Sequence, residues 1–580
     1  QLAGQQAASQ FANEQARRHF DRALALTPEE DLRARYDLTL ARQKVCDLQA
    51  DRAAQARDLA VLEALAEGLA DDQLGAEVAL WQSDYGESTG DYAASMEAAQ
   101  KAISLALAAG DMPQEAMGFR QWGRAHWRLA DYDEAHTLLE AALQRAQDAG
   151  LVAVEAETLH DLGLSAHHQG AETKAKACLE RALQLFTRLN DRRGEGRARN
   201  SLGLVQRTQG DYGRALASHE QALLAFHEIG DRRGEAMVLN NLGVISRLRG
   251  EYDQARTFYA QAIDIQREIG DRWNAAVSLN NLGNVVRDMG DYVAAEAIHV
   301  GALHEHQEIG NRHGEDIALE NLGNDALHQG NYAQARSYFE RSLAICTEVG
   351  DAKGQAYEHC YLGVVARSLG EYDEAGTCFR RALQLCGELQ YPRGRAFALV
   401  AQSLLRTQVG DYPSAAEDAL QALAIMQELG FRTGQGAAHL CLGHAQAGLG
   451  QPDRASTTYQ EALVVYRELG ETHRAMEPLA GLARASLALG NLARAQDCVE
   501  EILGYVREHS LPGGGEPLRT YLTCYQVLSA SDDPRARDVL SRANALLQEQ
   551  AAKIEDADAR RTFLKNVAAH REIEAAYTNA

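Results

Sequence analysis

A period of 40 residues runs through most of this chain and constrains its fold more than any other feature. Tyr stands two residues after most of the repeated glycines, and Ala stands five residues after them from Ala135 onward. The repeated glycines are Gly90, Gly170, Gly210, Gly250, Gly290, Gly330, Gly370, Gly410, Gly450 and Gly490. A unit this short cannot bury a core alone, so the repeat predicts stacked copies of one unit.

Each unit reads as two helices, because a turn signal also falls halfway through it. In steps such as Gly230-Asp231, Gly can adopt the left-handed conformation just past a helix end. Asp can then accept hydrogen bonds from the free N–H groups of the next helix. Between the turns, apolar residues such as Ala255, Tyr259 and Ala262 recur at helical spacing. We therefore predict an all-α solenoid of about fourteen antiparallel helix pairs.

Small residues recur where the two helices of a unit would meet. Gly203, Gly243, Ala215 and Ala222 keep the repeat register and would let the helices approach closely. Larger side chains at Gly243 or Ala222 should overpack this contact, at a cost of about 1–3 kcal/mol. The scarcity of Pro, with 9 in 580 residues, agrees with long uninterrupted helices.

Composition excludes several classes of protein. With 58 Lys and Arg against 82 Asp and Glu, the net charge of −24 argues against binding to nucleic acid or to an anionic membrane surface. The sequence contains no apolar stretch of membrane-spanning length and no signal-peptide pattern. Its 9 cysteines include no Cys-x-x-Cys pair, which predicts neither a disulfide framework nor a zinc site. We expect a cytoplasmic protein.

The quality of the repeat divides the chain into three parts. Residues 1–112 read as degenerate helix pairs that start inside a repeat, and residues 113–510 read as the regular 40-residue array. Residues 511–580 read as one more degenerate pair and a capping helix near 557–577. The first helix of the first pair would then begin before Gln1.

The repeat resembles the tetratricopeptide repeat in its 40-residue form. The resemblance is carried by residues 230–255, GDRRGEAMVLNNLGVISRLRGEYDQA. Similar units occur in Pins-type scaffolds, in kinesin light chains, and in the C-terminal sensor regions of bacterial STAND-type signalling ATPases and cyclase-type regulators. The resemblance implies a right-handed superhelix whose first helices line a concave groove that binds peptides.

The open face of these first helices carries Asn and Arg. On a helical wheel, Leu279, Leu282 and Val286 form the packing stripe, and the polar residues of the same helix lie opposite. Amides suit the alternating N–H and C=O groups of an extended peptide, and guanidinium groups suit carboxylates. The predicted peptide-binding residues are Asn200, Arg207, Asn240, Asn241, Arg247, Asn280, Asn281, Asn284, Arg287, Asn321, Asn324 and Arg367.

A structural reading of the same residues stays open. The Asn-Asn-Leu-Gly segment is also the consensus of the resembled family, in which Asn can bond to adjacent helix backbones. If the groove binds a ligand, the arginines at 40-residue intervals favour an acidic protein segment. We expect no metal, because His304 and His306 are two residues apart and point to different helix faces.

The sequence predicts no catalytic site. It contains no P-loop, HExxH, GxSxG or GxGxxG motif, so we expect neither enzymatic activity nor a cofactor. The leading prediction is a protein- or peptide-binding solenoid, the sensor or partner-recognition arm of a larger bacterial signalling protein with an upstream effector domain. The alternative is a stand-alone assembly scaffold that does not act as a switch.

Overall fold

The fold is entirely helical in the residues that the structure describes. The computed structural model describes residues 13–49, 51–129, 131–507, 511 and 516–579. These residues form 29 helices, which pack in consecutive pairs. The prediction of an all-α chain of about fourteen helix pairs is confirmed. The helix that we expected to begin before Gln1 lies outside the described residues.

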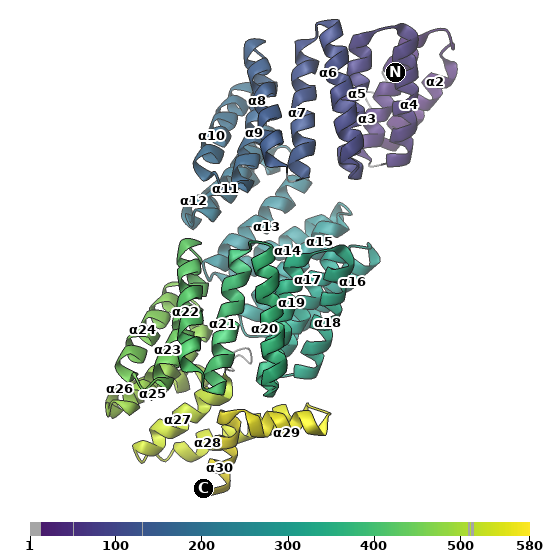
Figure 1. Ribbon diagram of the computed structural model, residues 1–580. Helices are drawn as coiled ribbons and strands as arrows, with labels where there is room; N and C mark the ends of the chain where they lie inside the picture. Colours follow the sequence, from purple (N-terminus) through teal and green to yellow (C-terminus); the bar gives the residue numbers. More distant parts are fainter. Residues whose placement is uncertain (1–12, 50, 130, 508–510, 512–515, 580) are drawn as a thin grey trace. The chain divides into compact units, whose positions relative to one another are not determined.

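The chain divides into two compact units, Gln1–Val238 and Leu239–Ala580. The division falls within α13 (Arg232–Leu248). The other helices of the first unit, coloured purple to blue in Figure 1, are α2 (Asn13–Leu26), α3 (Leu32–Leu48), α4 (Arg52–Leu69), α5 (Asp72–Thr89), α6 (Tyr92–Ala109), α7 (Met112–Arg128), α8 (Tyr132–Asp148), α9 (Val152–His168), α10 (Glu172–Leu189), α11 (Arg192–Thr208) and α12 (Tyr212–Glu228).

The second unit continues the same alternation of first and second helices. Its helices are α14 (Tyr252–Glu268), α15 (Arg272–Asp288), α16 (Tyr292–Glu308), α17 (Arg312–His328), α18 (Tyr332–Val349), α19 (Ala352–Leu369), α20 (Tyr372–Glu388), α21 (Pro392–Val409), α22 (Tyr412–Glu428), α23 (Arg432–Gly448), α24 (Pro452–Glu468), α25 (Thr472–Ala488), α26 (Leu492–Val506), α27 (Pro517–Ala530), α28 (Ala536–Ala552), α29 (Ala557–Asn566) and α30 (Ala568–Asn579). Through α26, the odd-numbered helices are the first helices of the repeats.

The turns between helices are built as the sequence predicts. Gly210 has a φ of +77°, which ends α11, and Asp211 then accepts a hydrogen bond of 3.1 Å from the N–H group of Arg214. Asn190 takes the place of Gly at one turn with a φ of +56°, which Asn tolerates better than most residues. Each turn therefore reverses the chain within a few residues, and this is why consecutive helices pack side by side.

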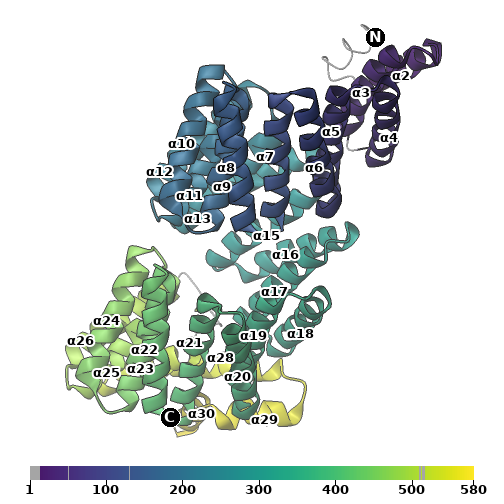
Figure 2. The same ribbon diagram turned by 45° about the horizontal axis from the view of Figure 1, so that its top comes forward.

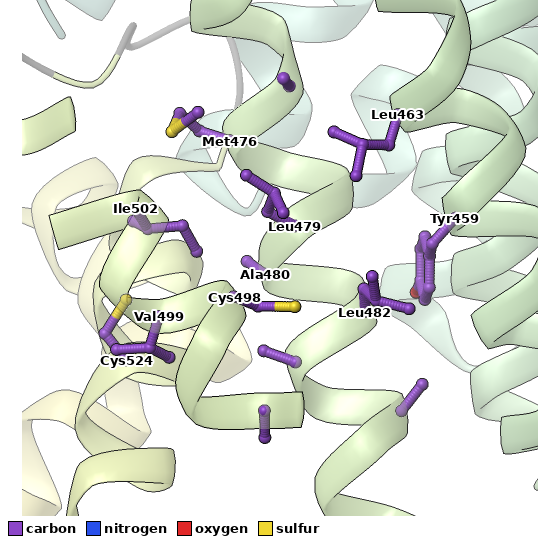
Figure 3. Close-up of a cluster of buried hydrophobic side chains, with 14 of the residues drawn as sticks. Tyr459, Leu463, Met476, Leu479, Ala480, Leu482, Cys498, Val499, Ile502 and Cys524 are labelled. Carbon is purple, nitrogen blue, oxygen red and sulfur yellow. The ribbon is translucent and has the colours of Figure 1, made fainter. Parts of the chain in front are cut away.

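Apolar residues from successive helices form the core between them. Figure 3 shows the largest such cluster, in which Tyr459 of α24, Leu482 of α25 and Val499 of α26 are buried. The cluster extends to Cys524 of α27, so it joins the regular repeats to the degenerate ones. Burial of this kind is the main stabilising contribution in a solenoid, where each repeat relies on its neighbours.

The C-terminal segment differs from the single capping helix that we predicted. The chain breaks at Val567 into α29 and α30, because Val567 is extended, with a ψ of 119°. The carbonyl groups that end α29 bond outside the helix, since His570 Nδ1 lies 2.8 Å from the Phe563 oxygen and Arg571 donates to the Asn566 oxygen at 2.9 Å.

These last helices fold back onto repeats that lie about 200 residues earlier in the chain. Lys553 donates to the carbonyl oxygen of Gln329 at 3.0 Å, and Asn566 donates to that of Gly370 at 3.1 Å. Phe563 is buried in one cluster with Tyr332 and Leu369. Figures 1 and 2 show α28 and α29 beside the α18–α20 region in both views. The segment therefore packs against the turns that follow α17 and α19 and against α19 itself.

Among the described residues, no helix combines the length and the apolar character needed to span a bilayer.

Candidate functional site

The first helices of the repeats line one face of each unit. In the first unit α7 contacts both α5 and α9, and in the second unit α21 contacts both α19 and α23. A helix that touches its next-but-one neighbour lies on the inner side of a curved stack. The free faces of these helices therefore form the inner surface, as predicted.

Four of the twelve predicted peptide-binding residues are buried inside the stack. Asn200, Asn280, Asn321 and Arg367 are each 4–6% exposed. Asn200 Oδ1 lies 3.0 Å from His219 Nδ1, and Asn280 Nδ2 lies 3.2 Å from His306 Nε2, so these amides bond to second helices. This corrects the helical-wheel placement, because one side of the supposed open face meets the neighbouring helix. The bonds of Asn200 and Asn280 agree with the structural reading of the amides, whereas Arg367 bonds to Glu516 at 3.3 Å.

Other predicted amides bond to one another across repeats. Asn281 donates to Asn240 Oδ1 at 3.1 Å, and Ser278 donates to the same oxygen at 3.2 Å. Asn324 donates to the carbonyl oxygen of Glu320 at 3.0 Å within its own helix. Asn241 and Arg207 are half-buried. Peptide binding by these partly exposed residues stays a prediction.

The predicted arginines of the second unit are paired with carboxylates, so this row is less positive than the sequence suggested. Arg247 Nε lies 2.6 Å from Asp288, and Arg287, which also donates to Asn284 and Asn321, lies 3.6 Å from Asp325. Burial alone would raise the pKa of Asp288, but the Arg247 guanidinium outweighs it and holds that pKa below its ordinary value. Asp288 stands 41 residues after Arg247, so the number of charges in the sequence did not indicate that the two residues form a pair.

A second row of arginines, in the first unit, was missed. Arg120, Arg124 and Arg128 recur every fourth residue on α7, and Arg197 of α11 lies on the same pocket of about 390 Å³. Trp127, His160 and Asp161 line the pocket with them. The four-residue spacing Arg-x-x-x-Arg-x-x-x-Arg in a first helix was the available sequence signal.

Carboxylates behind this pocket hold its arginines in place. Arg120 lies 2.6 Å from Asp161, Arg124 lies 2.8 Å from Glu87, and Arg197 lies 3.0 Å from Glu157. Arg128 also reaches Glu87, at 3.1 Å, and its guanidinium lies 4.8 Å from the centre of the Trp127 ring. The pocket lining carries four arginines and a single carboxylate, that of Asp161. These arginines are paired as those of the second unit are, but Glu87 and Glu157 do not line the pocket, so its lining itself carries more positive than negative groups.

The second unit contains a larger cavity of about 700 Å³. It lies between the inner helices α19, α21, α23 and α25 and the C-terminal helices α27, α28 and α30. Glu516 accepts hydrogen bonds there from Arg367, Gln408 and Arg519 at 3.3, 2.8 and 2.8 Å. Burial would raise the pKa of Glu516, but Arg519 and Arg367 keep it well below its usual range. The sequence pattern predicted no site in the degenerate part, residues 511–580. Glu516 and Arg519 lie in this part, and Arg484 lies in the repeat before it.

Histidines near His304 and His306 have hydrogen-bonding or ion-pair partners. His299 Nδ1 lies 2.5 Å from Asp325 in the core, and His304 lies 3.2 Å from Glu308 on the surface. Ligand atoms of His313, Asp316 and Asp351 lie within 4.8 Å of one another. Asp316 accepts from Ser342 and Cys346, and Asp351 caps α19. That no metal binds stays a prediction.

Sequence models of one family match much of the chain. Models described as tetratricopeptide repeat match residues 154–226, 234–303 and 355–428, residues 317–348, and residues 436–461 and 476–501. Together these matches cover just over half of the chain. No curated protein sequence matches it.

Several solved structures are similar to parts of the chain. BtubC (BKLC) from P. vanneervenii is 21% identical with a TM-score of 0.33, and the match covers 38% of this chain and 91% of that one. Yeast Tom70 is 14% identical with a TM-score of 0.36, covering 80% and 96%. The APC/C hetero-tetramer Cut9-Hcn1 is 16% identical with a TM-score of 0.45, covering 94% and 98%.

Proposed function

Because this chain belongs to the tetratricopeptide-repeat family, we propose that it is a protein-interaction solenoid, and that the inner face of its first unit binds an extended acidic segment of a partner protein. The arginine-lined pocket of α7, α9 and α11 supports the proposal most directly. Arg and Trp are the residue types that contribute most binding energy at protein interfaces. The pocket offers both, half exposed, on rigid helices.

The spacing of the inner helices suits an extended ligand. Packed helices lie about 8–10 Å apart, and an extended chain advances about 3.3 Å per residue. Every third residue of such a segment would therefore meet the next inner helix. An acidic segment with carboxylates at that interval would pair with Arg128 on α7 and with Arg197 on α11.

A peptide titration tests this proposal. The probe is a labelled fifteen-residue peptide with Glu at every third position and Ser between, and its counterpart has Gln in place of Glu. We expect the Glu peptide to bind the full chain in fluorescence anisotropy, and we expect its affinity to fall with added salt. Binding of both peptides with equal affinity, or of neither, would overturn the proposal.

A double variant locates the site. In Arg128→Gln, Arg197→Gln, Arg124 still pairs with Glu87 and Arg120 still pairs with Glu157, so no buried carboxylate loses its last partner. We expect the Kd of the Glu peptide to rise about tenfold or more, since charge-assisted hydrogen bonds are lost. The matched control, Arg181→Gln, Arg188→Gln, removes the same charge from the exposed face of α10 and should leave the Kd unchanged.

A sensor arm and a scaffold differ in the effect that binding has on the rest of the molecule. A sensor arm of a larger bacterial signalling protein would pass the binding event to an effector domain, as the family resemblance implies. A scaffold would only hold its partners, and the presence of a pocket in each of the two compact units favours this second candidate. Hydrogen exchange with the Glu peptide bound separates them. Protection that changes only in α7–α11 supports the scaffold, and changes that spread into the second unit support the sensor.

A further inference from the structure

We propose that the cavity of the second unit is a binding site for a small organic anion, a hydroxylated carboxylate or phosphate, held by Arg484 and Arg367. This site is separate in sequence and residues from the peptide surface proposed above. Its existence does not depend on that proposal.

The unpaired charge of Arg484 is the first reason. Its Nη1 donates to Thr523 Oγ1 at 2.7 Å, but its Nη2 is buried and makes no hydrogen bond. Burial and the nearby charge of Arg519 lower the pKa of Arg484. The carboxylate of Glu516 raises the pKa of Arg484, but it already accepts from three other donors. A buried guanidinium without a carboxylate partner is costly, and an anion in the cavity would supply the missing charge.

Unsatisfied polar atoms of the lining residues are the second reason. Arg367 Nε, Thr407 Oγ1, Gln408 Oε1 and Gln550 Oε1 are buried without a hydrogen-bond partner, and all four residues line this cavity. Arg367 and Gln550 are each 4% exposed. Native proteins leave few such atoms, so this concentration around one cavity calls for a ligand. The arginines offer donors and the glutamines offer acceptors.

This donor and acceptor set defines the class of ligand. An anionic group would accept from the free Arg484 and Arg367 N–H groups, and hydroxyl groups would donate to the Gln408 and Gln550 oxygens. Small residues such as Ala447, Gly448 and Ala485 line the inner helices and leave room for a ring or a short carbon chain. The volume of about 700 Å³ lies within the range of roughly 300–1,000 Å³ for small-molecule sites.

The C-terminal helices form one side of this cavity. Val567, Ala568 and His570 line it together with Leu518 and Leu522 of α27. Burial lowers the pKa of His570 to about 4, so its imidazole is neutral at pH 7, and Glu572 of the same helix also lines the cavity. A small molecule fits this partly covered space, which the C-terminal helices close on one side.

A thermal-shift experiment on the full chain tests the proposal. The probes are ribose 5-phosphate and gluconate, which carry the phosphate and the carboxylate alternatives, and D-ribose is the uncharged control. We expect at least one anion at about ten times its Kd to raise the Tm by about 2–4 °C, and D-ribose to have no effect. If neither anion raises the Tm above the D-ribose value up to 10 mM, water alone fills the cavity and the proposal is wrong.

Variants connect the response to the cavity. Arg484→Gln should abolish the shift, and without ligand it should melt no lower than the wild type, because an unpaired buried charge is removed. The control Arg467→Gln removes a guanidinium from an exposed pair with Glu501 and should keep the shift. If Arg484→Gln does not fold, Ala488→Trp at the exposed rim serves instead, since the larger ring narrows the cavity. An unchanged shift in the folded variant would overturn the proposal.

Discussion

The ring of Tyr259 covers Gly243 so closely that a Cβ atom added to Gly243 would lie 2.8 Å from the ring. The same relationship joins the first and second helices of other repeats, where a first-helix glycine lies beneath the side chain found 16 residues later. These further pairs are Gly123 with Leu139, Gly163 with Leu179, Gly203 with His219, Gly283 with His299, Gly323 with Phe339, Gly363 with Phe379 and Gly443 with Tyr459. Helix approach in this chain therefore depends on the absence of a Cβ atom at one position.

Gly243→Ala should lower the midpoint of thermal unfolding, although Ala is the better helix former. The added methyl group overlaps the Tyr259 ring, and overpacking of this kind costs about 1–3 kcal/mol. Gly301→Ala in α16 is the matched control, because no atom lies within 4 Å of its added Cβ atom. The control should gain about 0.5–1 kcal/mol from helix propensity alone. Equal midpoints for the two variants would contradict the packing described here.

His219 should make the protein less stable in mild acid. Burial and the charge of Arg207 lower its pKa to about 4, whereas an unfolded His has a pKa of about 6.5. As the pH falls from about 6.5 towards 4, the unfolded chain binds the proton first, so stability is lost over that interval. The double variant Asn200→Cys, His219→Phe removes this titrating imidazole. It introduces the pair of residues that a later repeat has at the same positions, Cys360 and Phe379.

Urea unfolding at pH 7.5 and at pH 5.0 measures this effect. The double variant should lose less stability between the two pH values than the wild type does. His304→Gln is the control, since its imidazole is exposed, and it should follow the wild type. A double variant with the same pH dependence as the wild type would show that His219 is not the titrating group.

Glu320 should make the protein more stable in mild acid than at pH 8, which is the opposite of the effect expected for His219. Burial raises its pKa to about 7, although Tyr361 donates to its carboxylate at 3.2 Å. Because the folded pKa exceeds the unfolded value of about 4.3, the charged carboxylate destabilises the fold above pH 7, and this cost disappears as the pH falls towards 5. Glu320→Gln should therefore raise the urea midpoint at pH 8 and change it little at pH 5. The control Glu340→Gln, on the exposed face of α18, should leave the urea midpoint unchanged at both pH values.

The contact of the C-terminal helices with the earlier repeats should be lost when Phe563 is truncated. Phe563 is fully buried beside Tyr332, and Phe→Ala in a core costs about 3–5 kcal/mol. We expect Phe563→Ala to release α29 and α30 and to increase amide hydrogen exchange in α19. Phe226→Ala removes an equally buried ring from the first unit. If that control deprotects α19 to the same degree, the effect is general destabilisation rather than loss of this contact.

The 40-residue period of the sequence predicted the contacts that occur in every repeat. It did not predict the contacts that occur only once in the chain. Gly210 and Asp211 end one helix and begin the next as expected, because turn chemistry is local. The pairing of Arg247 with Asp288 crosses one repeat, so a helical wheel of a single helix could not show it. The bond from Asn566 to Gly370 spans 196 residues and belongs to no repeat. Nothing local encodes such a contact, and the cavity beside it was missed for the same reason.

Photo-crosslinking of the Glu peptide to the full chain tests the central claim most directly. The peptide carries benzoylphenylalanine at its centre, and mass spectrometry identifies the residues to which it couples. We predict that the crosslinks fall on α7, α9 and α11 and disappear in Arg128→Gln, Arg197→Gln. Crosslinks on the outer helices α8 and α10, or crosslinks that persist in the double variant, would contradict a binding surface at the arginine pocket of the first unit.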